Sequence, residues 1–211
     1  MTSGAAHDDG HLGQHLAEDA AGMVDAYVDG DVDGDFEFRP GEIVGVQAED
    51  ARAVERDRLF RDVLGRFATG VTVVTGLLDG VPYGLTCQSF TSVSLDPPLV
   101  LFCPARTSRA WPLIQRSGHF CVNILAAGQV EVSRTMAGRG TDKFAGLDWS
   151  PSTATGSPVL AGTLGFVDAT ISSVHEAGDH FVVVGRVLDL EARDTDRPLL
   201  FFRGGYGTTD G

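Results

Sequence analysis

No apolar run in this 211-residue sequence approaches the roughly 20 residues that a membrane-spanning helix needs. The first ten residues, MTSGAAHDDG, have neither the positive start nor the apolar core of a secretory signal. Cysteine is scarce, and Cys87, Cys103 and Cys121 form no CxxC pair, which argues against a disulfide framework. We therefore expect a cytoplasmic protein whose thiols are reduced and buried.

Several signatures of nucleotide and hydrolytic sites are also absent. The sequence contains no GxGxxG after a strand, no GxxxxGK[ST], no HExxH and no GxSxG. These absences exclude the usual phosphate-cradling loops, zinc-protease sites and hydrolase elbows, so any nucleotide must be held in another way. No basic patch is large enough to indicate nucleic-acid binding, and a net charge of −13 opposes it.

The acidic charge is concentrated at one end of the chain. Residues 1–55 hold 14 acidic residues and 2 arginines, whereas residues 56–211 are close to neutral. The first segment is rich in Asp, Gly and Ala, which predicts a disordered extension ahead of one folded domain over residues 56–211. The run VDGDVDGD at Val28–Asp35 resembles part of a calcium loop, but no convincing helix follows, so we predict no metal site.

The domain opens with a helical pattern. Apolar residues from Leu59 to Phe67 follow the i, i+1, i+4, i+5, i+8 spacing of an amphipathic helix, which we expect to pack against the domain. The β-branched run Phe67–Thr75 predicts a strand, and Asp79-Gly80 is a hairpin-turn signal.

The stretch Gly84–Trp111 organises the rest of the chain. Small hydroxyl residues alternate with apolar ones up to Leu95, Asp96-Pro97-Pro98 breaks the run, and Leu99–Cys103 resumes it, which predicts strand, turn and strand. A helix should then begin near Trp111, with Thr107 or Ser108 as its N-cap. Arg106 and Arg109 beside that N-terminus would suit a phosphate.

The remaining chain alternates strands with short helices and one loop. We expect strands at 120–125, 164–174, 180–190 and 199–203, a helix at 129–137, and a covering loop at 138–161 anchored by Phe144 and Trp149. About seven strands with two or three short helices favour a closed antiparallel barrel over a parallel sheet.

An ordered series of motifs makes the chain recognisable. The block GLTCQSFTSVSLDPPLVLFCPARTSRAW is followed by FCVNIL, DKFAGLDW, GSPVL, GDHFVVVGRV and PLLFFRGGY. Together they resemble the flavin reductase family, the small components of two-component flavin-dependent monooxygenases, and are most similar to the reductase of the secosteroid hydroxylase system. This resemblance implies a mainly β fold, the split β-barrel (an FMN-binding, Greek-key antiparallel barrel), with flavin bound at a homodimer interface.

The resemblance also implies a role for individual residues. Thr86, Cys87, Gln88 and Ser89 would line the isoalloxazine and ribityl groups of FAD or FMN, and the backbone of Cys103, Pro104 and Ala105 would pass under the ribityl chain. Ser108 and Arg109 would hold phosphates, and Arg134 would contact a phosphate or the adenine. His180 would lie beside the nicotinamide as the catalytic-site histidine. Tyr206 would cap the nicotinamide.

The reaction implied is hydride transfer from NADH or NADPH to flavin, which demands no general acid or base from the protein. Reduced flavin would then pass to a separate monooxygenase. The alternative is a split-barrel protein that binds flavin or haem without turnover. The residues do not decide between FAD and FMN or between NADH and NADPH, and they leave the role of the extension open.

Overall fold

A computed structural model of the protein describes residues 51–140, 142–193 and 197–209. Its helices are α2 (Ala51–Leu64), α3 (Trp111–Ser117) and α4 (Val130–Ala137), with a 3-10 turn, η1 (Ala127–Gln129), just before α4. Its strands are β1 (Thr69–Gly70), β2 (Thr72–Leu78), β3 (Val81–Cys87), β4 (Thr91–Leu95), β5 (Pro98–Phe102), β6 (His119–Ile124), β7 (Trp149–Pro151), β8 (Pro158–Leu160), β9 (Gly165–Ala177), β10 (His180–Ala192), β11 (Leu200–Phe202) and β12 (Gly205–Gly207).

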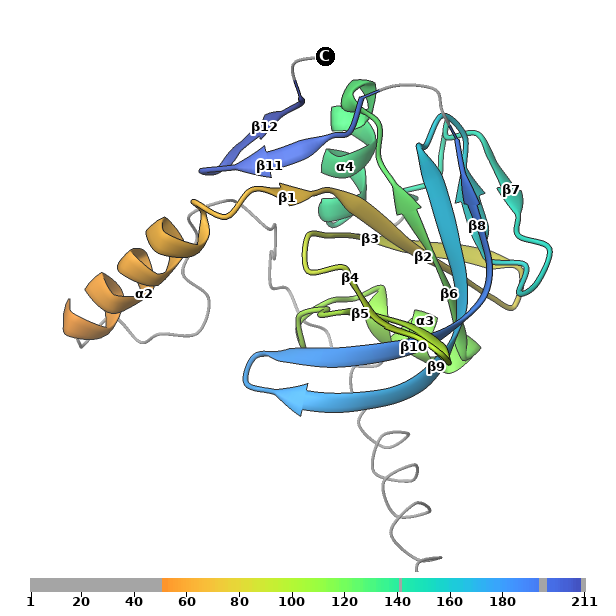
Figure 1. The fold of residues 1–211 in the computed structure, drawn as a ribbon, viewed down its shortest axis with the longest axis horizontal. Coiled ribbons are helices and arrows are strands. Elements are labelled where there is room, and N and C mark those ends of the chain that lie inside the picture. The colour runs from red at the N-terminus through yellow and green to blue at the C-terminus, as the bar shows by residue number, and fades with distance from the viewer. Residues whose placement is uncertain (1–50, 141, 194–196, 210–211) are drawn as a thin grey trace, which may run out of the picture. The chain divides into compact units, whose positions relative to one another are not determined.

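A seven-stranded antiparallel sheet dominates the fold (Figure 1). Its strand order is β3-β2-β6-β9-β10-β5-β4, so the two edge strands, β3 and β4, are neighbours in the sequence. Only residues 88–90 connect them, and four residue steps reach at most about 14 Å. The sheet must therefore curl until its edges approach each other. The predicted mainly β, antiparallel barrel class with short helices is confirmed.

The two predicted hairpins are confirmed. Asp79 and Gly80 both have positive φ, of 51° and 78°, as a two-residue turn with the twist of the flanking strands requires, and they join β2 to β3. Leu95 pairs with Pro98 across the second turn, where β4 and β5 meet. The long run before that turn was predicted as one strand, but it divides into β3 and β4, because the chain crosses there from one sheet edge to the other.

The helix ends differ in part from the prediction. Gly118 adopts the left-handed conformation that ends α3, as its pattern-breaking position indicated. The N-cap of α3 is Ala110 rather than Thr107 or Ser108, so that prediction is wrong in position. The Ser108 hydroxyl nevertheless accepts a hydrogen bond of 3.2 Å from the Trp111 N–H.

The two largest apolar clusters of the core lie one on each face of β2. Val74 belongs to the cluster inside the barrel, where the rings of Phe102 and Phe120 pack edge to face with centroids 5.0 Å apart. Val73 points to the other cluster, which lies against α4. Burial on both faces explains why β2 lacks the alternation of apolar and polar residues that a half-exposed strand shows.

The predicted covering loop over residues 138–161 contains a small hairpin, β7 and β8. Phe144 is buried in the second cluster, and its ring lies 6.1 Å from that of Trp149, which confirms both as anchors. Two further strands close the described chain where one was predicted, because β12 pairs with β11.

The first described helix departs from expectation. It begins at Ala51, ahead of the predicted domain boundary at residue 55, and its apolar stripe is exposed rather than packed within the described chain. Residues 1–50 of the predicted extension, which include the calcium-like run, lie outside the described residues. Among the residues that are described, no helix is long and apolar enough to cross a membrane, and no group of three His, Cys, Asp or Glu side chains could hold a metal ion.

Candidate functional site

The segment after β5 lies against the start of β10. Ala105 forms an isolated bridge with His180, and the Phe181 N–H donates to the Pro104 carbonyl at 2.9 Å. The Arg106 N–H donates to the Asp179 carbonyl, also at 2.9 Å. Backbone pairing therefore brings the predicted ribityl-side segment, residues 103–105, beside the predicted nicotinamide-side histidine.

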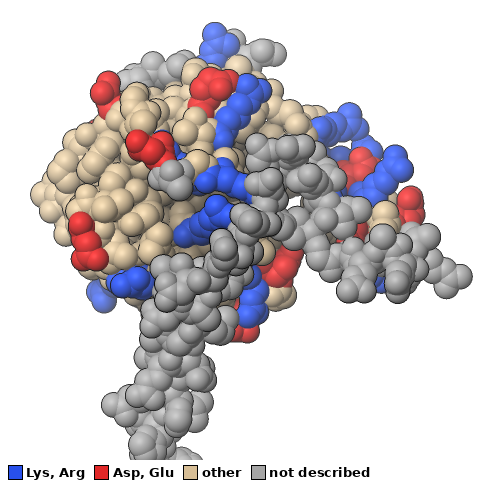
Figure 2. Space-filling view, turned by 180° about the vertical axis from the view of Figure 1, so that it is seen from behind, with Lys and Arg blue, Asp and Glu red and all other residues tan. Residues whose placement is uncertain are grey.

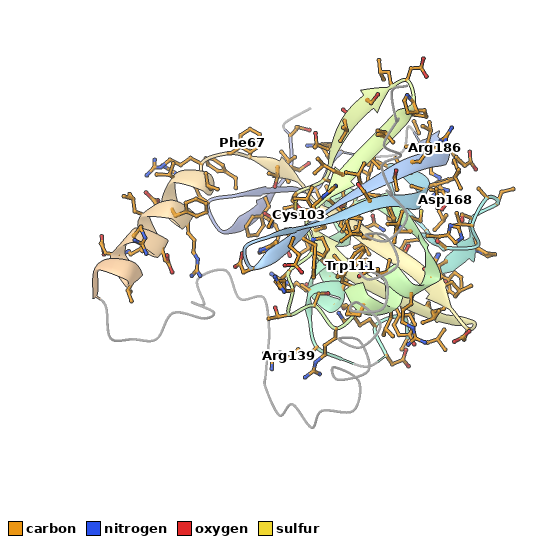
Figure 3. All side chains as sticks on the ribbon, turned by 90° about the horizontal axis from the view of Figure 1, so that it is seen from below. Phe67, Cys103, Trp111, Arg139, Asp168 and Arg186 are labelled. Atoms are coloured by element: carbon orange, nitrogen blue, oxygen red, sulfur yellow. The ribbon has the colours of Figure 1, made fainter. Side chains whose placement is uncertain are left out.

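Ser89 connects the end of β3 with the end of β5. Its hydroxyl accepts a hydrogen bond of 2.8 Å from the Cys103 N–H and lies 3.1 Å from the Cys87 sulfur. Burial raises the pKa of the Cys87 thiol, so this sulfur is a neutral thiol at physiological pH. Of the residues that the family resemblance assigns to the flavin, Ser89 and Cys103 are therefore in direct contact, and Figure 3 labels Cys103.

A second chain of contacts joins β3, α4 and the final hairpin. The Thr86 hydroxyl donates to the Ser133 carbonyl at 2.6 Å, and the Ser133 hydroxyl lies 2.9 Å from the Tyr206 hydroxyl. The Arg134 guanidinium lies 5.7 Å from the centre of the Tyr206 ring and pairs with Glu131 at 2.6 Å. Thr86, Arg134 and Tyr206 are therefore neighbours, although they come from three elements.

His180 is held by the residue before it. Its Nδ1 lies 2.8 Å from a carboxylate oxygen of Asp179, and the hydrogen bond lowers the pKa of Asp179 below its usual value. This contact fixes Nδ1, rather than Nε2, as the ring nitrogen that pairs with Asp179. The His180 side chain is 44% exposed, so the ring is accessible to a ligand.

Lys143 is a cation that the sequence analysis missed. Its Nζ donates to the Met136 carbonyl at 2.8 Å and to the Gly84 carbonyl at 3.4 Å, which places it beside β3. Burial, with the nearby positive charge of Arg109, lowers its pKa from 10.5 to about 8. Two cations close together indicate a site for an anion. The only signal in the sequence was its place in the DKFAGLDW motif.

The rest of the surface shows a related charge pattern. Figure 2 shows Lys and Arg side chains grouped near the middle of one face, with acidic side chains spaced around them. Such a grouping favours anionic ligands on that face of an otherwise near-neutral domain.

Gln88 directly follows β3, between Cys87 and Ser89 in the sequence, and is half-buried. Ser108 orders the loop that leads to α3, because its N–H donates to the Ala105 carbonyl at 3.0 Å.

Two hollows, of about 150 and 410 Å³, lie beside β7 and β8 and share Asp148, Leu160 and Ala161. Neither hollow is lined by a predicted site residue.

Comparisons with known proteins agree with this geometry. The model of the flavin reductase like domain matches residues 64–210. The chain is 52% identical over 165 residues to the reductase subunit HsaB of a flavin-dependent monooxygenase from Rhodococcus jostii, covering 78% of this chain and 84% of that one. It is 44% identical over 153 residues to the FMN reductase (NADH) SmoA from Agrobacterium fabrum, covering 72% and 86% of the two chains.

A solved structure gives the same result for the fold. The nitrilotriacetate monooxygenase component B from Mycobacterium thermoresistibile superposes with a TM-score of 0.72 at 51% identity. The match covers 76% of this chain and 89% of the other. The curled antiparallel sheet described above is therefore a split β-barrel.

Proposed function

The chain belongs to the family of flavin reductase like domains and is an NAD(P)H-dependent flavin reductase; we propose that it serves as the reductase component of a two-component monooxygenase. The observation that carries the proposal is the family match over residues 64–210, together with relatives named as monooxygenase reductase subunits. The partner would be a separate flavin-dependent monooxygenase that receives the reduced flavin.

The residues present fit a flavin. The end of β3 offers small side chains and backbone groups from Thr86 to Ser89, which allow a flat ring to approach closely. We propose that residues 103–105 pass beneath the ribityl chain. Ser108 and Arg109, joined by Lys143, would bind phosphate, since the two cations lie near each other beside β3.

We assign the nicotinamide side to His180. Asp179 holds the imidazole, and the backbone of His180 pairs with Ala105 in the proposed ribityl segment. Tyr206 was predicted to cap the nicotinamide, and its hydroxyl bonds to Ser133. We propose that it also orients α4, and that Arg134, exposed on the same helix, contacts a phosphate or the adenine.

A flavin accepts hydride at N5 from C4 of the reduced nicotinamide, and that chemistry resides in the two cofactors. The protein contributes by binding the rings in contact and by placing N–H groups and cations near the negative charge that develops. The contacts described involve hydroxyl groups, backbone and cations rather than paired carboxylates. This composition suits hydride transfer, in which the protein donates no proton to the reacting atoms.

We also propose that the protein works as a homodimer in the cytoplasm. Some of the predicted site residues, such as Ser89 and Arg109, are exposed, and a second subunit can cover them. Cys87, Cys103 and Cys121 are all free, which is typical of proteins from reducing compartments.

The decisive assay follows oxidation of NADH and NADPH by the purified full chain, with FAD, FMN or no flavin. We expect oxidation that requires flavin, and a His180→Ala variant should raise KM for the nicotinamide more than KM for the flavin. A wild-type protein that binds flavin but gives no flavin-stimulated oxidation with either nucleotide would support the non-catalytic alternative instead.

A further inference from the structure

The guanidinium of Arg106 lies against the ribbon formed by β9 and β10. Its Nη1 donates to a carboxylate oxygen of Glu176 on β9 at 3.1 Å, and its central carbon lies 5.4 Å from the centre of the Phe181 ring on β10. The second distance is that of a cation–π contact. The sequence offered Arg106 to a phosphate, whereas the structure gives its charge a carboxylate partner within the chain.

The two residues that Arg106 contacts belong together. Phe181 and Glu176 are directly opposite each other in the antiparallel pairing of β9 with β10, so their side chains lie on the same face of the ribbon. His180 precedes Phe181 along β10, and its side chain therefore projects from the other face. Arg106 thus holds the ribbon from the face opposite to the proposed nicotinamide side.

The backbone joins the same two segments. The Phe181 N–H donates to the Pro104 carbonyl, and the Arg106 N–H donates to the Asp179 carbonyl, each at 2.9 Å. His180 lies between these two hydrogen bonds, so they align it with the proposed ribityl segment. The side chain of Arg106 adds a third attachment, which reaches past β10 to β9.

The ion pair is too exposed to contribute much to folding. The side chains of Arg106 and Glu176 are 36% and 68% exposed, and ion pairs at such exposure add little to stability. The rate of hydride transfer is far more sensitive to geometry, because a displacement of about 1 Å between reacting groups can slow a reaction by about 100-fold. A contact of this kind can therefore matter for the reaction while it matters little for the fold.

We propose that Arg106 is a positioning residue for hydride transfer. By binding Glu176 and Phe181, it holds the turn that carries His180 at a fixed place relative to the flavin-side segment, residues 103–105. This inference rests on the nicotinamide and flavin assignments proposed above. Arg106 itself touches neither cofactor and acts through the ribbon.

The opposite end of the ribbon supplies a matched control. There Phe166 on β9 is directly opposite Glu191 on β10. The Arg193 guanidinium lies 5.7 Å from the centre of the Phe166 ring, and its Nε pairs with Glu191 at 2.6 Å. The same three residue types are combined in the same way, and none of the three is a predicted site residue.

The test follows the anaerobic reduction of flavin by NADH in a stopped-flow instrument, with the full chain at saturating nucleotide concentrations. Arg106→Met removes the charge and keeps an unbranched side chain. We expect the reduction rate to fall by about 10- to 100-fold, while the flavin Kd changes by less than about threefold. Arg193→Met should lower Tm to a similar small extent and leave the rate within about twofold of the wild type.

Reversal of the pair tests the contact itself. Arg106→Glu and Glu176→Arg should each slow flavin reduction, because each places like charges together. The double variant should be about tenfold faster than the slower single variant, as a direct coupling between the two positions predicts. If Arg106→Met melts early, Glu176→Gln replaces it, since it alters one exposed carboxylate only, and it should slow reduction by roughly three- to tenfold.

Each remaining outcome decides against the proposal. A reduction rate that Arg106→Met leaves unchanged, or a loss that Arg193→Met matches, would overturn the positioning role. A weakened flavin Kd with an unchanged reduction rate would make Arg106 a phosphate ligand instead. Wild-type protein that reduces no flavin would overturn the proposed function itself, so the two failures are distinguishable in the same experiment.

Discussion

At the scale of single residues, the protonation of Lys143 is set by its surroundings. Burial and the nearby Arg109 lower its pKa to about 8, so the ammonium form is present at neutral pH and is lost as the pH rises through 8. If Lys143 binds a flavin phosphate, FMN affinity should fall between pH 7 and pH 9. We expect Lys143→Gln to weaken FMN binding at pH 7 by about tenfold, as one lost charge-assisted hydrogen bond would.

The measurement is quenching of FMN fluorescence at several pH values. Lys143→Arg is the control, because its guanidinium stays protonated at pH 9 and should flatten the loss of affinity above pH 8. Equal FMN affinity for the wild type and Lys143→Gln at pH 7 would remove this lysine from the phosphate site.

Gly185 shows how closely the barrel interior is packed. A Cβ added there would overlap ring atoms of Phe120, which is fully buried against Phe102. We expect Gly185→Ala to destabilise the fold by ~1–3 kcal/mol and to lower Tm by several degrees, as overpacking does. Phe120→Leu in the same chain should restore part of the loss.

Gly70→Ala serves as the control, since a Cβ at that position meets no atom within 4 Å. Calorimetry of the variants checks the prediction. If Gly185→Ala and Gly70→Ala melt at the same temperature, the Phe120 ring can move away from the added methyl group at little cost in stability.

At the scale of elements, one hydrogen-bond chain links β3, α4 and β12. Ser133 is buried, and its hydroxyl has the Tyr206 hydroxyl as partner, while its carbonyl accepts from Thr86 on the proposed flavin strand. Tyr206→Phe leaves a buried hydroxyl with one partner fewer and should cost about 1–3 kcal/mol. The flavin KM should rise as well, because α4 helps to hold Thr86.

A double-mutant cycle with Ser133→Ala isolates the contact. Denaturant unfolding of the two single variants and the double variant should give a coupling free energy of about 1 kcal/mol. Additive effects would mean that the hydroxyl pair contributes nothing, and that backbone pairing with β11 and packing of the Tyr206 ring on Phe201 hold the last hairpin without it.

At the scale of the whole molecule, charge is distributed unevenly. Residues 1–50 hold thirteen acidic residues and one arginine, and flavin and nicotinamide nucleotides are anions. We expect a chain that lacks residues 1–50 to keep its kcat, while kcat/KM for NADH rises modestly at low salt through weaker long-range repulsion. The difference should fade near ~0.15 M salt, where the Debye length is about 8 Å.

Truncation after residue 50 leaves α2 whole. Initial rates over a series of salt concentrations measure the effect, and thermal melting provides the control for folding. A truncated chain that melts several degrees earlier and loses activity at every salt concentration would show that the extension is part of the folded structure.

The sequence alone determined the features whose causes lie close together along the chain. The turn at Asp79-Gly80, the hairpin around Pro97-Pro98 and the end of α3 at Gly118 each depend on the backbone preferences of one or two residues. The ordered motifs likewise sufficed for the family and the barrel class. The roles of the individual site residues remain predictions.

Only the tertiary structure decided which distant segments meet. Local sequence patterns hold no information about the order of strands in a sheet. Here β6 pairs with β9, although its neighbours in the sequence are β5 and β7. Likewise, the pKa of Lys143 depends on burial and on Arg109, which is distant in the sequence. The amphipathic stripe of α2 predicts that its apolar face is buried but cannot specify by what, because the same pattern suits a partner within the chain or in a second copy.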